Sequence, residues 1–164
     1  MISLIKATET DIPLIRELAE ISWNSAYADI LSRNQIDYML SLMYSADEIS
    51  AHLQNPNYHY YLIFDDNIAV GFIGYEHHYE PETTKLHRIY LIDEAKGKGC
   101  GKQALNFLKK QVSEQGDNRI ILNVNKENKA RYVYESQGFN IYKEDVFDIG
   151  NGFVMDDYLM EIRL

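Results

Sequence analysis

Three glycines alternate with other residues where a segment typical of a β-strand gives way to a segment typical of an amphipathic helix. They are Gly97, Gly99 and Gly101. Glycine lets a backbone approach a ligand closely, and the helix that follows offers unpaired N–H groups and a positive dipole end. Three lysines add positive charge: Lys96, Lys98 and Lys102. The segment predicts a phosphate or pyrophosphate site, and the alternative is a sharp connection whose lysines serve only solubility.

Two common phosphate-binding patterns are absent from this loop. A Walker loop, GxxxxGK[ST], fails because Gly101-Lys102 is followed by Gln103 and because Lys96 occupies the position of the first glycine. A dinucleotide fingerprint, GxGxxG, fails because its last glycine would have to be residue 102. The loop also comes late in the chain instead of after the first strand. Nucleotide hydrolysis and dinucleotide redox chemistry are therefore disfavoured.

The periodicity of apolar residues predicts a mixed α/β fold. Alternating or β-branched runs predict strands at residues 2–7, 58–64, 68–75, 86–92, 120–124, 139–148 and 153–163. Spacings of three and four predict helices at residues 11–27 and 36–43, a short one from 45 to before 55, one after the glycine loop and one at 127–137. The expected order is β-α-α-β-β-β-α-β-α-β-β. No repeat or linker divides the chain, so we expect one domain over residues 1–164.

Charge and cysteine content exclude several function classes. Lys and Arg number 16 against 25 Asp and Glu, a net charge of −9, which disfavours a nucleic-acid binder that neutralises phosphates. The acidity serves solubility or favours a cationic partner. One cysteine excludes a disulfide framework and a multi-thiolate zinc site. No apolar run approaches the ~20 residues that span a membrane, and the N-terminus lacks a signal sequence, so we expect a cytoplasmic protein.

Two blocks of the chain resemble the GNAT N-acetyltransferase family. Residues 96–101, Lys-Gly-Lys-Gly-Cys-Gly, are similar to its acetyl-CoA loop Q/R-x-x-G-x-G/A, with Lys96 where the family usually has Gln or Arg. Residues 122–139, which contain Asn128, Ala130, Tyr134 and Gly138-Phe139, resemble its later motif. The residues Trp23-Asn24-x-x-Tyr27 resemble the first-helix region of many bacterial members, and the element order matches the whole GNAT fold.

The resemblance implies acetyl-CoA as co-substrate, and no metal. Backbone amides of the glycine loop would bind the CoA pyrophosphate: Lys96, Gly97, Lys98, Gly99, Cys100, Gly101 and Lys102. The strand before the loop would be splayed from its neighbour, and its free backbone groups near Ile89 and Leu91 would pair with the pantetheine arm. Asn128 would contact the pantetheine amides, and Tyr134 would lie near the thioester sulfur.

Tyr134 is our candidate general acid. When an amine attacks the thioester carbonyl, a thiolate leaves, and a phenol of pKa about 10 can donate a proton to it. The backbone N–H of Leu91 is the candidate stabiliser of the oxyanion. Tyr132 lies on another helical face. Each residue also has a structural alternative, which for Tyr134 is a core aromatic between helix and sheet.

His87 or Glu76 is the candidate general base, because an ammonium group of pKa near 10.4 must lose a proton before it attacks. His87 shares strand parity with Ile89 and Leu91, which predicts that it faces the same cleft. His77 and His78 are adjacent on a strand and point to opposite faces, so we expect no metal site there. The structural alternative for each is a solvated or hydrogen-bonded side chain.

The acceptor is the least constrained part of the sequence. Trp23 and Tyr27 are candidate substrate-binding residues, since aromatic side chains pack on alkyl chains and cations. The last segment carries carboxylates that could attract a polyamine or peptide amine: Glu144, Asp145, Asp148, Asp156, Asp157 and Glu161. The sequence weakly favours a polyamine-like acceptor of a bacterial enzyme. A homodimer, and a non-catalytic acyl-CoA sensor on the same fold, are further possibilities, and we expect no covalent role for Cys100.

Overall fold

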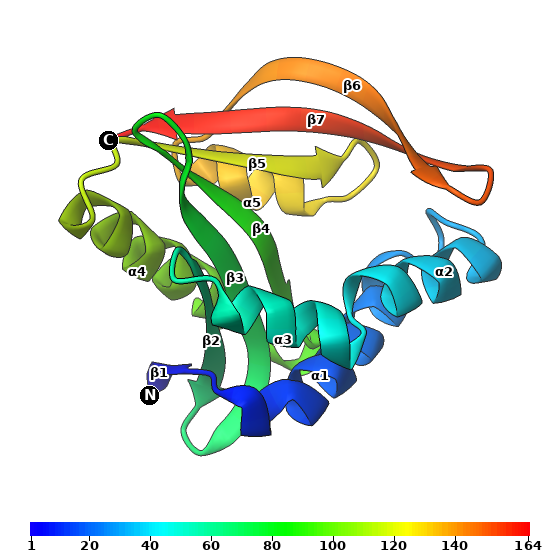
Figure 1. The fold of residues 1–164 in the computed structure, drawn as a ribbon, viewed down its shortest axis with the longest axis horizontal. Coiled ribbons are helices and arrows are strands. Elements are labelled where there is room, and N and C mark those ends of the chain that lie inside the picture. Colours follow the sequence, from blue (N-terminus) through cyan, green and yellow to red (C-terminus); the bar gives the residue numbers. More distant parts are fainter.

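The computed structural model describes residues 1–164 as one mixed seven-stranded sheet with helices on both faces (Figure 1). The strand order is β1-β2-β3-β4-β5-β7-β6, and only the β4–β5 pair is parallel. The strands are β1 (Ile2–Lys6), β2 (Tyr58–Asp65), β3 (Ile68–Glu80), β4 (Thr83–Leu91), β5 (Arg119–Asn125), β6 (Asn140–Gly150) and β7 (Phe153–Arg163). The predicted mixed α/β class and all seven strands are confirmed.

Five α-helices connect the strands. They are α1 (Ile12–Ala26), α2 (Arg33–Met43), α3 (Ala46–Gln54), α4 (Cys100–Glu114) and α5 (Ala130–Ser136). The short helix predicted from residue 45 is present as α3, so three helices, and not the two of the expected order, precede the second strand. Two serines cap the starts of α2 and α3: Ser32 Oγ accepts from the N–H of Gln35, and Ser45 Oγ accepts from the N–H of Glu48, each at 3.1 Å.

Helix α5 begins three residues later than the sequence predicts. The side chain of Asn125 accepts a hydrogen bond from Glu127 N–H at 2.9 Å, and that of Asn128 accepts one from Ala130 N–H at 2.9 Å. These two bonds hold residues 126–129 as a turn, since a short amide side chain competes with helical backbone bonding. Asn128 therefore lies in the loop before α5 and not on the helix.

The core is divided between the two faces of the sheet. Helices α1, α2 and α3 cover one face, where Ile15, Trp23 and Phe72 are almost fully buried. Helices α4 and α5 cover the other, where Leu105 and Ile120 are almost fully buried. We call these the α1–α3 face and the α4–α5 face.

Strands β4 and β5 pair over only part of their lengths. Residues 83–86 of β4 pair with residues 119–122 of β5, and beyond them the strands diverge (Figure 1). On the other side of β4, Ile92 N–H donates to Val70 O at 2.9 Å, and the antiparallel pairing with β3 continues through Leu91 and Ile89. Because backbone groups alternate in direction along a strand, the N–H groups of Leu91 and Ile89 face the gap.

A β-bulge interrupts β4 just before this gap. Arg88 pairs with Gly74. Leu86 pairs with the next residue of β3, Tyr75, so His87 has no partner. An extra residue in one strand reverses the alternation of side chains beyond it. The direction of His87 therefore cannot follow from simple strand parity.

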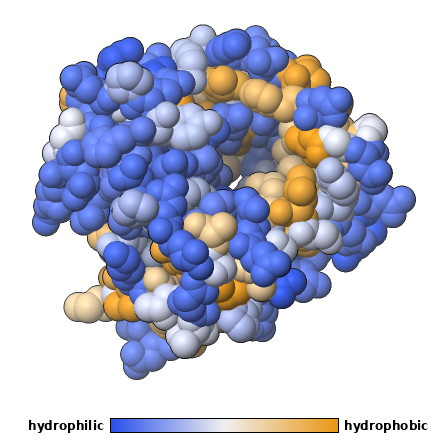
Figure 2. Space-filling view, viewed as in Figure 1, coloured by the Kyte–Doolittle hydropathy of each residue, from blue (hydrophilic) through white to orange (hydrophobic).

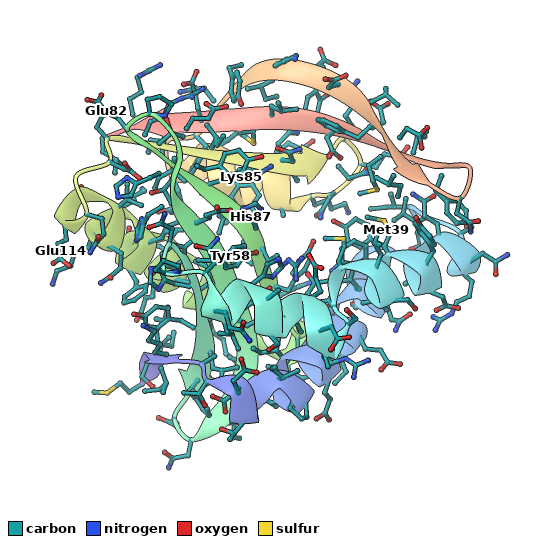
Figure 3. All side chains as sticks on the ribbon, viewed as in Figure 1. Met39, Tyr58, Glu82, Lys85, His87 and Glu114 are labelled. Atoms are coloured by element: carbon teal, nitrogen blue, oxygen red, sulfur yellow. The ribbon has the colours of Figure 1, made fainter.

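The bulge places His87 and Arg88 on the same face of the sheet. His87 stacks on Tyr58 with 5.0 Å between ring centroids (Figure 3). Arg88 donates to the hydroxyl of Tyr60, and both tyrosines belong to the α1–α3 face. Ile89 packs on the α4–α5 face. The predicted shared face of His87 with Ile89 and Leu91 is therefore wrong, because the bulge adds one residue between them.

No helix is long and apolar enough to cross a membrane. No group of three or more His, Cys, Asp or Glu side chains is arranged to hold a metal ion. His77 and His78 have separate partners: His77 Nδ1 lies 2.9 Å from Thr84 Oγ1, and His78 Nδ1 lies 2.8 Å from Asp117 Oδ1.

Candidate active site

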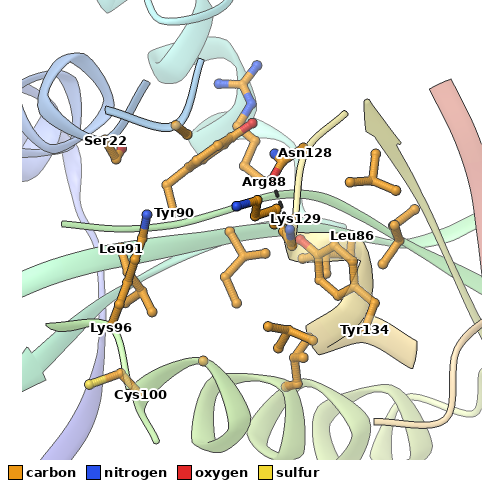
Figure 4. Close-up of a pocket in the computed structure, with 18 of the residues that line it drawn as sticks. Ser22, Leu86, Arg88, Tyr90, Leu91, Lys96, Cys100, Asn128, Lys129 and Tyr134 are labelled. Atoms are coloured by element: carbon orange, nitrogen blue, oxygen red, sulfur yellow. Dashed lines mark hydrogen bonds between the residues drawn. The ribbon is translucent and has the colours of Figure 1, made fainter. Parts of the chain in front are cut away.

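A cleft of about 960 Å³ connects the glycine loop with the gap between β4 and β5 (Figure 4). It also reaches the end of α1, so it is open toward both faces of the sheet. Figure 2 shows a hollow near the middle of the molecule, bordered by hydrophilic and hydrophobic residues. Most of the predicted site residues line the cleft: Tyr27, His87, Ile89, Leu91, Lys96, Gly97, Gly99, Cys100, Gly101, Lys102, Asn128 and Tyr134. Trp23, Glu76 and Lys98 do not.

The glycine loop presents a row of unused backbone donors to the cleft. Gly97 and Gly99 have φ angles of +78° and +83°, which only glycine adopts without strain. A Cβ atom at either position would meet nothing within 4 Å, so no protein atom crowds the loop at these two residues. The first backbone bond of α4 runs from Gln103 N–H to Gly99 O, which leaves the N–H groups of residues 100–102 without helical partners.

The side chains of the loop take different positions. The Lys96 ammonium lies 2.9 Å from the Asp93 carboxylate, at the surface. Cys100 is 1% exposed, and burial raises the pKa of its thiol above the ordinary value. A thiol that keeps its proton is a poor nucleophile, which agrees with the expectation that Cys100 has no covalent role.

Tyr134 projects from α5 into the cleft (Figure 4). Its ring packs edge-on to Phe139 with 5.9 Å between centroids, and the residue is 9% exposed. Burial raises the pKa of the Tyr134 phenol, so the hydroxyl remains protonated at neutral pH. Tyr132 is 59% exposed, beside Arg131. The structure thus separates the two tyrosines as helical spacing predicts.

Tyr27 closes the end of the cleft beside α1. Its hydroxyl lies 3.4 Å from the hydroxyl of Tyr90 and accepts a hydrogen bond from Asn128 Nδ2 at 3.3 Å. Trp23 lies one helical turn earlier and is 1% exposed. Its ring packs against Tyr27 and Tyr90, and its indole N–H donates to Tyr44. Trp23 therefore supports the wall of the cleft from behind, and the predicted direct contact of Trp23 with a substrate has no basis in this structure.

The two candidate bases form a pair. His87 Nε2 lies 3.0 Å from Glu76 Oε1. The imidazole stacks on the ring of Tyr58 and contacts the ring of Tyr79 edge-on. Burial, with Lys85 and Arg88 nearby, lowers the pKa of His87 well below its ordinary value. The imidazole is therefore neutral at physiological pH. If Nε2 carries the proton shared with Glu76, the lone pair is on Nδ1.

Two charged residues of this region were not singled out by the sequence. Arg88 lines the cleft and is 7% exposed. Asp157, on β7, is 6% exposed, and its Oδ1 atom is buried without a hydrogen-bond partner. Of the six carboxylates in the last segment it is the only buried one. An arginine inside the apolar run 86–92 was the available signal for Arg88, whereas nothing in the sequence separates Asp157 from Asp156.

The buried Asp157 carboxylate is expected to reduce stability above pH 6. Burial raises the pKa of Asp157 from 3.8 to about 6, so the folded state binds this proton more tightly than the unfolded state does. The free energy of unfolding therefore falls as pH rises from about 4 to 6, and the loss persists at higher pH. At about 1.4 kcal/mol per pH unit, Asp157→Asn should stabilise the protein by on the order of 2 kcal/mol at pH 7.5 and by almost nothing at pH 4.

Thermal unfolding at the two pH values measures this effect, and a gain of roughly 4–8 °C in Tm is expected at pH 7.5. The matched control is Asp156→Asn, because Asp156 is exposed and pairs with Lys126 at 3.0 Å. That variant should change Tm little or lower it slightly. Equal Tm values for Asp157→Asn and the parent protein at pH 7.5 would mean that the carboxylate is better solvated than its burial indicates.

Comparison with known proteins agrees with this architecture. Residues 27–160 match the family model described as "Acetyltransferase (GNAT) domain". The chain is similar to a protein from Thermoplasma acidophilum named spermidine N(1)-acetyltransferase, with 28% identity over 94% of this chain and 96% of that protein.

Solved structures share the fold over the whole length. The PaiA N-acetyltransferase of Thermoplasma acidophilum, crystallised with coenzyme A, superposes with a TM-score of 0.85 and 24% identity, covering 100% of this chain and 99% of that one. The ribosomal-protein-S18-alanine N-acetyltransferase of Escherichia coli has a TM-score of 0.74 and 16% identity, covering 99% and 94%. The family model spans most of the chain, and this protein therefore belongs to the GNAT acetyltransferase family.

Proposed function

We propose that this protein transfers the acetyl group of acetyl-CoA directly to a primary amine of a small molecule or peptide. The observation that carries the proposal is the convergence of three features on one cleft. These are the unpaired donors of the glycine loop, the backbone N–H of Leu91 in the gap between β4 and β5, and the Tyr134 hydroxyl.

The glycine loop fits the pyrophosphate of CoA. Its free N–H groups at the start of α4 are donors at the positive end of a helix dipole, and the space before Gly97 and Gly99 is open. Lys98 and Lys102 contribute positive charge without fixed direction. In this proposal the extended arm of the co-substrate lies along β4, beside the backbone groups of Ile89 and Leu91, and Asn128 contacts its amides.

The transfer step needs an oxyanion donor, an acid and a base. The amine nitrogen attacks the thioester carbonyl carbon, a C–N bond forms, and the carbonyl oxygen accepts a hydrogen bond from Leu91 N–H. The C–S bond then breaks, and the departing sulfur takes a proton from the Tyr134 hydroxyl. The attacking nitrogen loses two protons through the base. One returns to the Tyr134 oxygen and the other is released, so an ammonium group and the thioester give an amide, a thiol and one proton.

We propose that His87 and Glu76 act together as the base. The neutral imidazole lines the cleft, and because burial lowers the pKa of His87, a proton taken up on Nδ1 would pass from Nε2 to the Glu76 carboxylate 3.0 Å away. His87 lies on the α1–α3 face, next to Arg88. An amine that approaches from the α1–α3 face would meet His87 on that face and the thioester of the co-substrate in the gap between β4 and β5.

The name of one relative makes polyamines the first acceptors to test, and the acidic charge of the chain is compatible with them. Amino acids and peptide N-termini complete the acceptor panel. We also propose that the protein is bacterial and cytoplasmic. Residues 1–164 form a single domain in this proposal, and two copies form a homodimer. The alternative function is an acyl-CoA sensor that binds the thioester without turnover.

A thermal-shift measurement with CoA and acetyl-CoA tests the proposal. A ligand at about one hundred times its Kd adds roughly 2.7 kcal/mol to the free energy of unfolding, and Tm should rise by roughly 5–10 °C. Thiol release with the acceptor panel then reports turnover. ATP and NAD are the control ligands, because the loop lacks the Walker and dinucleotide patterns.

The outcomes distinguish the enzyme from the sensor and from neither. A shift with acetyl-CoA but not with ATP or NAD, followed by thiol release with an amine, supports the enzyme. A shift without release for any amine favours the sensor. The absence of any shift with either thioester or CoA would contradict both, and would point to Lys96 as a substitution that removes the family's ligand.

A further inference from the structure

Arg88 carries a buried positive charge that no carboxylate neutralises. Its Nη1 atom donates to Met43 O and to the Tyr60 hydroxyl, each at 2.8 Å, and its guanidinium carbon lies 4.4 Å from the centroid of the Tyr44 ring. It takes part in no ion pair, although the residue is 7% exposed. A buried cation normally has an anionic partner, because removing it from water is unfavourable by several kcal/mol.

The guanidinium also has unused donors. Nε is buried without a hydrogen-bond partner, and Nη2 makes no hydrogen bond to the protein. These two nitrogens form one edge of the planar group, and such an edge matches the two oxygens of a carboxylate. The bonds of Nη1 to Met43 O and Tyr60 hold the opposite corner in place. The side chain is therefore held in place while its Nε–Nη2 edge has no partner within the protein.

Arg88 lies on the acceptor side of the cleft. It lines the same cleft as Tyr134 and the glycine loop, but its contacts are with β2 and with the end of α2, on the α1–α3 face (Figure 4). The loop donors at Gly97–Lys102 are at the other end of the cleft, on the α4 side. The phosphates of CoA are therefore accounted for elsewhere, and an anion at Arg88 would have to belong to the acceptor.

We propose that Arg88 binds a carboxylate carried by the acceptor, so that the substrates are primary amines with a free carboxylate group. This inference rests on the proposed acetyl transfer and specifies its acceptor. Such a molecule supplies the missing counter-ion of Arg88 while its amine reaches the gap between β4 and β5. A polyamine brings no negative charge, and a second ammonium group near Arg88 would be repelled.

Acceptors matched in length and differing in one end group test the inference. The matched series is δ-aminovalerate, pentylamine and cadaverine, with leucine and leucinamide as a second pair, and spermidine is added as a longer polyamine. Charge-assisted hydrogen bonds of a fork of this kind correspond to roughly 10–100-fold in binding. We expect the carboxylate member of each pair to have a kcat/KM higher by that factor in the wild-type protein, with most of the difference in KM.

Variants of Arg88 test whether this residue causes the preference. Arg88→Gln should reduce the preference to about threefold or less, chiefly by raising KM for the carboxylate acceptors, and Arg88→Lys should restore part of it. The matched control is Arg16→Gln, because Arg16 Nε donates at 2.9 Å to the neighbouring carbonyl of Tyr44 but lies outside the cleft. That variant should keep the wild-type preference. A CoA-induced thermal shift verifies that each variant is folded.

Three results would overturn the inference. One is a wild-type preference for cadaverine and spermidine over the carboxylate acceptors, which would leave acetyl transfer itself intact. Another is an Arg88→Gln variant that binds CoA and keeps the carboxylate preference. The third is the failure of CoA binding and of thiol release in the wild-type protein, which would remove the proposed function and the inference together. If Arg88→Gln does not fold, the wild-type comparison of matched acceptors alone decides.

Discussion

Replacement of Tyr134 by phenylalanine is expected to lower kcat by about 10²–10³-fold while leaving the affinity for CoA unchanged. The variant retains the ring that packs against Phe139 and lines the cleft, and it loses only the hydroxyl, which makes no hydrogen bond within the protein. Removal of a general acid costs a factor in this range when the leaving group must depart as a thiolate. Thiol release under saturating acceptor measures kcat, and the thermal shift with CoA measures binding.

Tyr132→Phe is the matched control for this variant. Tyr132 is on the same helix, but it is 59% exposed and contacts Arg131 at the surface, so the substitution should leave turnover within about twofold. Because burial raises the pKa of Tyr134 above its ordinary value, wild-type activity should show no alkaline decline due to Tyr134 up to about pH 9. Turnover by Tyr134→Phe within threefold of wild type would exclude the proposed acid.

Gly71→Ala is expected to be the most damaging small substitution in the sheet. A Cβ atom at this position would lie 2.2 Å from Tyr90 O and 3.2 Å from Leu91 Cα, both of them backbone atoms of β4 that cannot move independently. Overpacking of this kind destabilises proteins by about 1–3 kcal/mol, and a backbone clash lies at the upper end. Chemical denaturation should show a lower midpoint, and acetyl transfer should fall further because the displaced residues include Leu91.

Gly101, which also lies beside Leu91, provides the comparison for Gly71. At Gly101 a Cβ atom would make an ordinary contact of 3.7 Å with Leu91, and the residue stands in the first turn of α4. Gly101→Ala should therefore retain or slightly raise stability, since alanine favours a helix over glycine. If Gly71→Ala unfolds at the same denaturant concentration as Gly101→Ala, β3 and β4 are not packed as closely as this structure has them.

The parts of the fold that sequence predicts are those governed by local rules. The dipeptide Asn-Gly is typical of a two-residue hairpin turn, and Asn151 and Gly152, which join β6 to β7, have the φ angles of +54° and +78° that such a turn requires. The resemblance to the family motif indicated Tyr134, and helical spacing placed Tyr132 on another face, where it is exposed. The glycine loop was placed between a strand and a helix, and the structure confirms that position with Gly99 as the residue before α4.

The errors have nonlocal causes or rest on local signals that suit two structures. The bulge at His87 depends on how β3 pairs with β4, and no pattern in either strand alone announces it. The later start of α5 depends on side-chain bonds of two asparagines, Asn125 and Asn128, which equally suit a helix start. Only burial made Arg88 a candidate and separated Asp157 from the other carboxylates of its segment, because the number of partners around a charge is decided by elements distant in sequence.

Because β4 diverges from β5, part of β4 has an unpaired edge in the middle of the sheet. An unpaired edge at the margin of a sheet can pair with another chain, and proteins usually shield it with charge, a bulge or a covering element. Here the edge beyond Leu86 is flanked by β5 and its continuation, so a folded neighbour cannot reach it, while a thin extended ligand can. A molecule that pairs with Ile89 and Leu91 would act as a short added strand and join the two halves of the sheet, as peptides do in β-augmentation. The binding free energy of such a molecule would then include the free energy gained by completing the sheet.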